Sequence, residues 1–354
     1  MTGPLRPATL DWSQGDPRAA DFGDVYFSSA GGLAESGHVF LDGNALPARF
    51  RALRQPDKEK ENLFNSEAYK EKLKSNSTQH QLADAAPATG FVLVETGFGT
   101  GLNWLATMAL WAACAPAADP PGPAWLHMVS VEKHPLTRDD LQRAHAHLLA
   151  HWPAAPATAA ASPGAPAALS LLATPTARGH ASALAAQLQS RWPALVPGFH
   201  RLVFPEWQAT LTLFFGDVAD FLPRLVARAD AWCLDGFAPD RNPAMWTPAL
   251  YAGMAARSRP GATLATFTAA GHVRRGLVAA GFTAHKAPGF GRKREMLVGA
   301  FEPAKAGACS EHPEPAASAS PPVPLRQTEE PVTEEAASAG MPPTEIPPAA
   351  PPLD

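Results

Sequence analysis

The stretch that decides the fold is F-V-L-V-E-T-G-F-G-T-G-L-N-W-L, residues 91–105. An apolar run ends in an acid, Glu95, and a glycine-rich turn then leads into an apolar run with helical spacing. This order predicts a buried strand, a tight loop and a helix. Glycine lets the backbone approach a ligand closely, and a helix start presents free N–H groups to it. The stretch therefore predicts a nucleotide-type cofactor site. Its candidate contacts are Gly97, Gly99, Gly101 and Asn103.

The spacing of the glycines bears on which cofactor would bind. It is G-x-G-x-G here, whereas the dinucleotide fingerprint is G-x-G-x-x-G with an acid about twenty residues later. The next acid at a strand end is Glu132, after the apolar run 126–131, and it lies further away. An acid at the end of each of the first two strands is typical of S-adenosylmethionine enzymes. The pattern favours that cofactor, and a purely structural glycine turn is the alternative.

Composition and charge narrow the class of protein. The 354 residues are 46% hydrophobic, which is ample for one large domain or two small ones. We find no apolar run of membrane-spanning length and no signal-peptide core, and the three cysteines are scattered, so a cytoplasmic protein is expected. The net charge is −4, but from Glu302 onward nine acids face two basic residues. The rest of the chain therefore carries +3, which is compatible with an RNA partner.

Apolar runs that alternate with helical patterns predict a mostly parallel sheet with helices on both faces and an antiparallel strand near the end. Seven strands are expected, at 91–95, 126–132, 211–215, 231–234, 262–267, 282–287 and 296–301. The chain divides into five parts by composition. These are an N-terminal β extension with a hairpin (1–50), a polar charged insertion (54–80), the main domain (91–301), a flexible Ala/Pro insertion within it (153–183) and a disordered tail (302–354).

Four acids fall at predicted strand ends, where open α/β sheets bind their ligands. Glu132 suits the two hydroxyls of a ribose, and Asp217 with the backbone of Val218 suits the adenine amine. Glu95 and the glycine loop suit the methionine end of the cofactor. A helix N-cap is the alternative role for each acid, since each begins a strand-to-helix turn.

The fourth acid, Asp235, is the candidate catalytic residue. Gly236, Phe237 and Pro239 follow it and suit a flat acceptor, which the N-terminal hairpin with Tyr26 would cover from one side. Methyl transfer moves positive charge from sulfur to nitrogen, so a carboxylate beside that nitrogen stabilises the transition state more than the ground state. It can also take the released proton.

Two further groups of residues have weaker patterns. The loop Arg292, Lys293 and Arg294 is a candidate for contacts to phosphates, with a solvated loop as the alternative. His147 and His151 are spaced four apart on a predicted helix, but a third ligand is not evident, so we expect no metal.

The assembled motifs closely resemble the methyltransferase half of the MnmC family, bacterial bifunctional enzymes that modify the tRNA wobble uridine. The matching stretches include D-V-Y-F-S (24–28), V-F-L-D-G-N-A-L-P-A-R-F (39–50), V-S-V-E-K-H-P (129–135), W-C-L-D-G-F-A-P-D-R-N-P-A-M-W (232–246) and P-G-F-G-R-K-R-E-M-L (288–297), besides the glycine loop.

The resemblance implies a Rossmann-like class I methyltransferase domain that uses S-adenosylmethionine. It implies methylation of the primary amine of 5-aminomethyl-2-thiouridine at the wobble position, with the tRNA anticodon stem-loop as partner. By motif, the glycine loop, Glu132 and Asp217 would bind cofactor and Asp235 would be catalytic.

The same resemblance marks what is missing from the sequence. The long family form carries a C-terminal flavin oxidoreductase, and nothing after Phe301 matches it, so we expect no FAD on this chain and a separate oxidoreductase as a candidate partner. An aminopropyltransferase of the spermidine-synthase kind and a non-catalytic RNA-binding or assembly module remain as alternatives.

Overall fold

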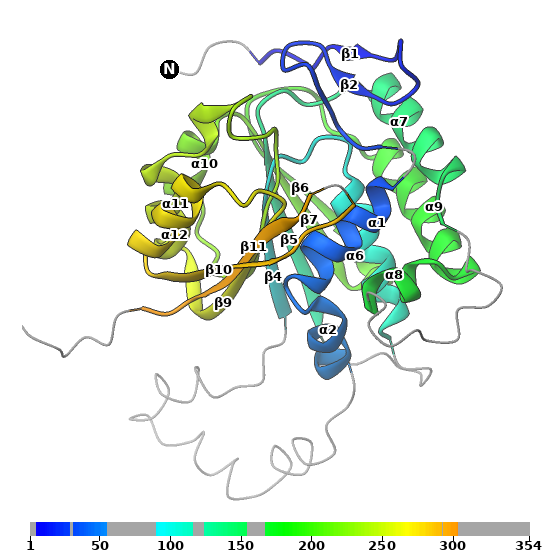
Figure 1. The fold of residues 1–354 in the computed structure, drawn as a ribbon. Coiled ribbons are helices and arrows are strands. Elements are labelled where there is room, and N and C mark those ends of the chain that lie inside the picture. The colour runs from blue at the N-terminus through cyan, green and yellow to red at the C-terminus, as the bar shows by residue number, and fades with distance from the viewer. Residues whose placement is uncertain are drawn as a thin grey trace, which may run out of the picture. The chain divides into compact units, whose positions relative to one another are not determined.

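The computed structural model describes residues 5–28, 31–54, 90–115, 124–153, 167–291 and 293–303. These residues form a central sheet of eight strands in the order β10-β11-β9-β8-β4-β5-β7-β6 (Figure 1). The strands are β4 (Gly90–Thr96), β5 (Trp125–Glu132), β6 (Gly198–Phe204), β7 (Ala209–Phe215), β8 (Ala229–Leu234), β9 (Ser258–Thr266), β10 (Phe282–Pro288) and β11 (Glu295–Phe301).

The middle of the sheet is parallel and its two edges are antiparallel. Strands β7, β5, β4, β8 and β9 pair in parallel. Strand β11 runs antiparallel between β9 and β10, as expected near the end of the chain, and β6 runs antiparallel to β7. The fold class is confirmed, but the prediction of seven strands is wrong by β6. Strand β6 lies at the edge of the sheet, and one of its faces, with Phe199 and Val203, is half-exposed. Its sequence, G-F-H-R-L-V-F, therefore includes polar residues and lacks the continuous apolar run of the central strands.

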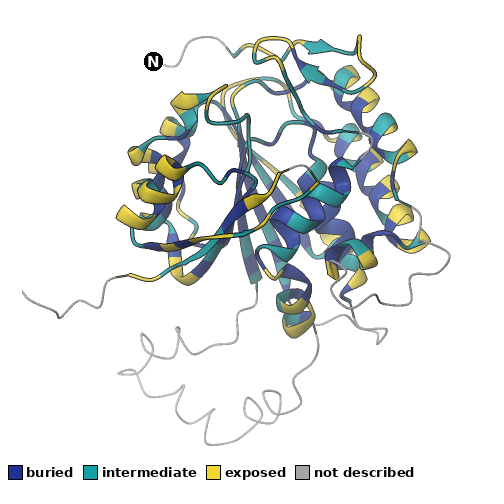
Figure 2. Ribbon diagram, viewed as in Figure 1, coloured by how far each residue is buried: buried dark blue, intermediate teal, exposed yellow. Residues whose placement is uncertain are grey.

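Helices cover both faces of the sheet (Figure 1). One side carries α6 (Leu102–Ala113), α7 (Arg138–Ala150), α8 (Ala167–Leu172) and α9 (Pro175–Ser190), and the other carries α10 (Val218–Arg224), α11 (Pro248–Ala256) and α12 (Gly271–Ala279). In β4, Leu93 belongs to the first core and Val94 to the second, as the alternation of side chains along a strand requires. Figure 2 shows these central strands buried and the outer faces of the helices exposed.

The N-terminal extension is only partly a β structure. Short strands β1 (Leu10–Asp11), β2 (Arg18–Ala19) and β3 (Asp24–Val25) form an antiparallel sheet of their own. The predicted second hairpin run is wrong, because residues 32–54 are helical. They form α1 (Gly32–Ser36), the π-helical segment η1 (Gly37–Asp42) and α2 (Leu46–Arg54). Packing decides the outcome: η1 lies against α8 and β9, and its Val39, Phe40 and Leu41 are all buried.

The predicted flexible insertion at 153–183 is also partly wrong. Helices α8 and α9 occupy its second half, and Thr174 caps α9 by accepting a hydrogen bond from the Ala177 N–H. Ala177, Ala181 and Leu184 are buried at helical spacing, which a composition of Ala, Pro and Ser disguises. Residues 154–166 of this insertion, residues 55–80 of the charged insertion and residues 304–354 of the tail lie outside the described residues.

No helix in the described part of the chain is long and apolar enough to cross a lipid bilayer.

Candidate functional site

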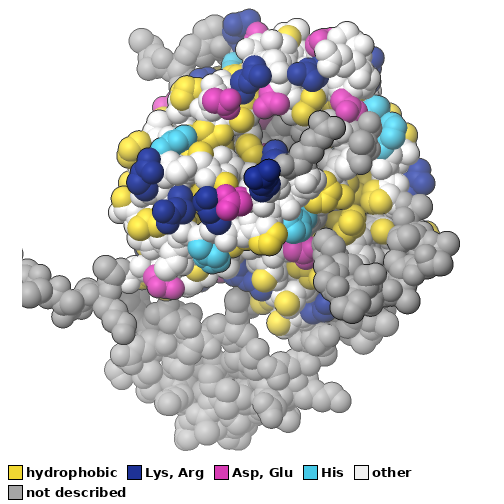
Figure 3. Space-filling model, viewed as in Figure 1, with side chains coloured by type: hydrophobic (Ala, Val, Ile, Leu, Met, Phe, Trp, Pro, Cys, Tyr) yellow, Lys and Arg dark blue, Asp and Glu magenta, His cyan; other side chains and the backbone are white. Residues whose placement is uncertain are grey.

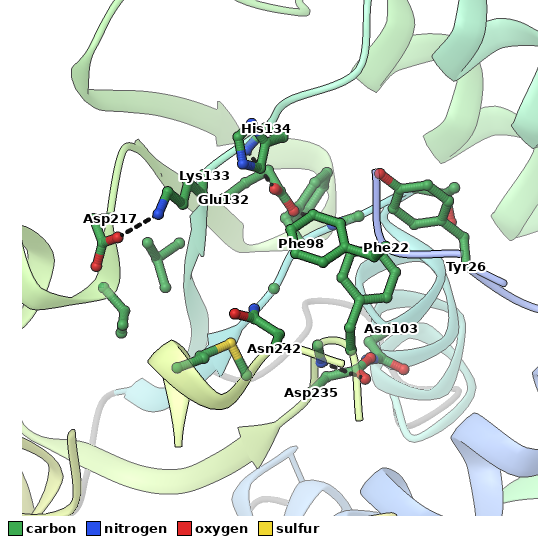
Figure 4. A pocket seen from close by; sticks show the side chains of 18 of the residues that line it. Phe22, Tyr26, Phe98, Asn103, Glu132, Lys133, His134, Asp217, Asp235 and Asn242 are labelled. Carbon is green, nitrogen blue, oxygen red and sulfur yellow. Dashed lines mark hydrogen bonds and ion pairs between the residues drawn. The ribbon is translucent and has the colours of Figure 1, made fainter. Parts of the chain in front are cut away.

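An open cavity lies at the carboxyl ends of β4, β5, β7 and β8. Because these strands are parallel, their ends meet at one edge of the sheet, so the four loops that follow them converge there. Nine residues predicted for the site line the cavity: Tyr26, Gly97, Gly99, Asn103, Glu132, Asp217, Val218, Asp235 and Phe237. Figure 4 shows Asp217 at the left of the view, Asp235 below its centre and Glu132 above its centre.

The glycine loop lies close against its neighbours. Gly97 has φ +82°, and a Cβ there would lie 3.0 Å from the Cα of Gly236 in the loop after β8. A Cβ on Gly99, at φ +55°, would lie 3.0 Å from the ring of Tyr26. Both the backbone angle and the space thus require glycine. Gly101 does not line the cavity; it precedes α6 at φ +75° beside the ring of Phe98.

Glu132 holds the glycine loop to β5. Its Oε2 accepts a hydrogen bond from the Gly99 N–H at 2.7 Å, and its Oε1 accepts one from the His134 N–H at 2.8 Å. A carboxylate has about four acceptor positions, so each oxygen keeps one for a ligand. The predicted contact with a ribose is compatible with this geometry and stays a prediction.

Asp217 is the N-cap of α10. Its Oδ1 accepts from the Ala219 N–H at 2.9 Å, and its Oδ2 lies 2.9 Å from Lys133 Nζ. Burial raises the pKa of Asp217, but the hydrogen bond from Ala219 and the charge of Lys133 outweigh it, so the pKa lies below its usual value. The N-cap alternative is therefore realised, and contact with an adenine amine stays a prediction.

Glu95 lies beneath the cavity rather than in its wall. It is 1% exposed, and its two oxygens accept hydrogen bonds from Ser130 Oγ at 2.6 Å and Asn103 Nδ2 at 2.9 Å. Burial, followed by the nearby Asp235, raises the pKa of Glu95 well above its usual value. Its predicted contact with the methionine end of a cofactor stays untested, because a layer that includes Asn103 separates it from the cavity surface.

Asp235 presents a desolvated carboxyl group at the cavity floor. Its Oδ1 accepts from the Gly236 N–H at 2.8 Å and its Oδ2 from Asn103 Nδ2 at 2.7 Å. Burial of the carboxyl raises the pKa of Asp235 to about 7, although these hydrogen bonds and the charge of Lys293 act in the opposite direction. The residue as a whole is only partly covered, because its carboxyl is buried at the base of an open cavity. Near neutral pH it exchanges a proton readily.

Three aromatic rings form one wall. The Phe22 ring stacks on Phe237 with centroids 4.5 Å apart, and Tyr26 meets Phe237 edge-on at 5.6 Å. Burial, with Glu132 nearby, raises the pKa of Tyr26 far above its usual value, so its phenol stays neutral. Phe22 was missed in the sequence because it lies in a polar, turn-rich segment. Asn242 and Met245 also line the cavity unpredicted, although both lie in the quoted 232–246 motif.

The predicted phosphate-binding loop lies apart from the cavity lining. Lys293 Nζ is 2.8 Å from Glu35 Oε1 and 4.4 Å from the centre of the Phe267 ring. Arg294 is exposed, Arg292 lies outside the described residues, and Pro239 does not line the cavity. Figure 3 shows basic side chains interspersed with acidic ones on the face in view. A role of these residues in binding substrate stays a prediction.

The helix α7 histidines have structural partners. His145 is buried between the Thr100 carbonyl and Gln189, and His147 lies 3.1 Å from Asp16. Within the described ranges, no group of three His, Cys, Asp or Glu side chains is placed to hold a metal ion.

The donor set of the cavity fits S-adenosylmethionine. Two glycines, Gly97 and Gly99, leave no room for side chains along one wall, as a closely held ligand requires. Glu132 and Asp217 keep free acceptor positions for hydroxyl and amine donors. Carboxylates around a desolvated floor also suit a ligand with a cationic sulfur.

The chain is similar in sequence to a methyltransferase family and to several bacterial proteins. A family described as S-adenosyl-L-methionine-dependent methyltransferase matches residues 180–302. The chain is 42% identical over 304 residues to a protein of Cupriavidus metallidurans, and 45% identical over 293 residues to one of Stutzerimonas stutzeri. Each is described as the tRNA 5-methylaminomethyl-2-thiouridine biosynthesis bifunctional protein MnmC.

The alignments cover most of this chain but only part of each relative. The alignments include 86% and 82% of this chain but 35% and 34% of the relatives, so the chain spans about a third of their length. Among solved structures, the chain is similar to MNMC2 from Aquifex aeolicus, with a TM-score of 0.49 and 17% identity over 86% of this chain and 73% of that one.

Proposed function

We propose that this chain is an S-adenosyl-L-methionine-dependent methyltransferase, as the match of residues 180–302 supports, and that it methylates the primary amine of 5-aminomethyl-2-thiouridine in tRNA. The product would be 5-methylaminomethyl-2-thiouridine, the nucleoside in the names of the relatives. One observation carries the proposal: a desolvated carboxyl, Asp235, faces the cavity beside the glycine loop.

When bound, S-adenosylmethionine supplies a methyl group on a cationic sulfur, which the amine lone pair takes as the carbon–sulfur bond breaks. The residues proposed to hold the cofactor are the backbone of the glycine loop, the free acceptor positions of Glu132, and Asp217 with Val218. Hydrogen bonds within the protein already fix Glu132, the glycine loop and Asp217 in place. Binding a ligand therefore costs little conformational entropy in these groups.

Asp235 is proposed to orient the acceptor amine and take its proton. The carboxylate keeps acceptor positions beyond those used by Gly236 and Asn103, and these face the cavity. Positive charge that develops on the nitrogen is stabilised by the carboxylate in a poorly solvated place, where the interaction is strong. As the nitrogen gains the methyl group it loses a proton to an Asp235 oxygen.

The aromatic wall is proposed to receive the base that carries the amine. Phe237 and Tyr26 offer flat and edge contacts for a pyrimidine ring, and Phe22 extends the same wall. Sequence-specific contacts of proteins with RNA are made mostly to unpaired bases, and the anticodon loop presents the wobble base unpaired. We therefore propose the anticodon stem-loop as the part of tRNA that enters, in the cytoplasm.

A separate flavin-dependent oxidoreductase is proposed to supply the aminomethyl substrate. The relatives are bifunctional by name and about three times as long as the part that this chain matches. The reaction proposed here needs a free primary amine, so an activity that unmasks this amine must act first.

The test is methylation in vitro with purified protein. tRNA that carries 5-aminomethyl-2-thiouridine is incubated with S-adenosylmethionine, and its nucleosides are identified by mass spectrometry. We expect one added methyl group on that nucleoside. Decarboxylated S-adenosylmethionine with a free diamine serves as the competing assay; aminopropyl transfer there, without methylation of tRNA, would refute the proposal.

A further inference from the structure

A buried hydroxyl from the N-terminal helices reaches the network at the cavity floor. Ser36, the last residue of α1, is 2% exposed, and its Oγ donates a hydrogen bond to Asn103 Oδ1 at 2.5 Å. Asn103 is in the first turn of α6, 67 positions further along the chain. The contact therefore joins an element outside the sheet to the loop that follows β4.

Asn103 has no donor left for a ligand. One N–H of its side-chain amide goes to Glu95 Oε1 at 2.9 Å and the other to Asp235 Oδ2 at 2.7 Å. The carbonyl oxygen of the Asn103 side chain accepts a hydrogen bond from the hydroxyl of Ser36. An amide has two donors, so the predicted role of Asn103 as a donor to the cofactor would require breaking one of these bonds.

The orientation of this amide is set by its three partners. If the amide were flipped, its oxygen would face the two carboxyl groups and its nitrogen would lose the bonds to them. The two carboxyl groups thus select the orientation seen here, and Ser36 completes it by donating a hydrogen bond to the amide oxygen. A hydrogen bond accepted by the carbonyl also polarises the amide, which strengthens the N–H donors on the far side.

We propose that Ser36, acting through the side-chain amide of Asn103, positions the Asp235 carboxylate at the cavity floor with its free acceptor positions directed toward the acceptor amine. Both are positioning residues, since Ser36 bonds to Asn103, and Asn103 in turn bonds to Asp235 and Glu95. The identity of the amine rests on the proposed function. The positioning of Asp235 by Ser36 and Asn103 does not depend on it.

The charges around Asp235 explain why a fixed donor is needed there. Glu35 on α1 is a like charge that raises the pKa of Asp235, and Lys293 in the loop before β11 is the opposing cation; Glu95 on β4 is a buried carboxyl whose own pKa is raised by burial and by Asp235. Lys293 is also paired with Glu35, so its attraction for Asp235 is shared. Asn103 is the neutral donor that lies between Glu95 and Asp235 and bonds to both.

The experiment is a titration of Asp235 in the full chain. Protein labelled with ¹³C at the aspartate carboxyls is followed by NMR over pH, and the Asp235 resonance is identified by its absence in Asp235→Asn. We expect Ser36→Ala to raise the pKa of Asp235 by about half a unit, because the anion loses part of a hydrogen bond. In parallel, kcat for tRNA at saturating cofactor should fall about twofold at pH 7 and recover above pH 8, since raising a pKa of about 7 by half a unit lowers the charged fraction at pH 7 from about one half to about one quarter.

Ser258→Ala is the matched control. Ser258 is a buried serine whose hydroxyl bonds to Met254 O and Trp232 Nε1, and it lies where β9 begins, at the other end of the sheet. It should leave both the titration and kcat as in the wild type. If Ser36→Ala does not fold, Ser36→Cys keeps the volume with a weaker donor and should give a smaller shift in the same direction.

Two results would overturn the proposal. One is an Asp235 titration in the Ser36 variant that coincides with that of the wild type. The other is a loss of kcat at all pH values without a shift of that titration. Failure of the wild type to methylate tRNA would instead remove the proposed function, and the NMR titration would still decide whether Ser36 acts on Asp235.

Discussion

The acids that follow the parallel strands have similar sequence contexts, but their hydrogen-bond partners and nearby charges in this cavity differ. Glu132 and Asp217 are held by backbone N–H groups and, for Asp217, by a lysine. Asp235 receives one backbone N–H and one amide N–H, at a desolvated floor with Glu35 and Glu95 nearby. Asp217, whose pKa is lowered, is suited to stay charged, and Asp235, whose pKa is raised to about 7, is suited to change its protonation.

Turnover should therefore depend on Asp235. We expect Asp235→Asn to lower kcat by about 10²–10⁴, the usual contribution of a general base, while affinity for S-adenosylmethionine stays within threefold of the wild type. In the wild type, kcat should rise with pH through about 7, since the pKa of Asp235 is raised to about 7. Steady-state kinetics from pH 5.5 to 9 and calorimetry test this; wild-type turnover in the variant would remove Asp235 from the mechanism.

The pH dependence of folding stability should also depend on the carboxyl group of Asp235. The pKa of Asp235 is raised from 3.8 to about 7, so between these values the folded protein binds more protons than the unfolded chain, and stability falls as pH rises through this window. Asp235→Asn removes the titration. We expect the variant to gain stability relative to the wild type as pH rises from 4 to 7, by at most about 4 kcal/mol, and the difference to stay level above that. Urea denaturation at pH 4, 6 and 8 measures it; a difference independent of pH would contradict the prediction.

Cofactor affinity should depend on Glu132. In Glu132→Gln one amide N–H must face the N–H of Gly99 or of His134, so one buried hydrogen bond becomes a repulsion. We expect a loss of about 1–3 kcal/mol, which is roughly 5- to 150-fold in Kd for S-adenosylmethionine. Calorimetry measures the affinity, and unchanged binding would mean that the ribose is held by other groups.

The residues that sequence could predict are those whose chemistry shows in a local motif. Glu132, Asp217 and Asp235 line the cavity with two glycines of the loop, because strand, turn and helix are local patterns, whereas Glu95 and Gly101 do not line it. Phe22 and Ser36 could not be found this way, since each reaches the site through contacts far along the chain. Lys293, whose charge suggested phosphate, pairs with Glu35, and its role in binding substrate stays a prediction.

At the scale of elements, hydrophobic periodicity and residue propensity predicted the strands of the sheet well and the helices around it less well. Central strands are buried on both faces, so their apolar runs are unmistakable. Segment 39–50 has the β-branched and aromatic residues of a strand, yet it is helical because η1 and α2 bury those side chains against α6, α8 and β9. Composition hid α8 and α9, whose buried faces are made mostly of alanine and leucine.

Helix α9 should contribute to stability as a core element. Leu184 is fully buried on it, and we expect Leu184→Ala to lower the free energy of unfolding by about 2–5 kcal/mol, through lost burial and a cavity. Ser182 is exposed on the same helix, and Ser182→Ala should change it by less than about 0.5 kcal/mol. Urea denaturation compares the two. Equal, small effects would show that α9 is not part of the cooperative core.

At the scale of the whole molecule, the distribution of charge sets how RNA would approach. Residues 307–354 carry eight acids and one basic residue, and the rest of the chain carries +3. The described residues all belong to one compact unit, Met1–Ala306. The cavity and all the residues argued to act in it belong to that unit.

Removing residues 307–354 should therefore leave kcat unchanged. Affinity for tRNA should rise about two- to fivefold at low salt, because an acidic segment no longer competes with the phosphates, and the gain should vanish above about 0.3 M salt. Filter binding at several salt concentrations measures the affinity. A fall in kcat would show that the segment takes part in the reaction.

The stacking of Phe22 on Phe237 has a consequence for how the protein is made. Phe22 precedes its partner ring by 215 positions, and strands β4 to β8 are synthesised between the two. A nascent chain that stops before β8 thus lacks Phe237, and Phe22 stays without this partner until β8 and the loop after it have been made.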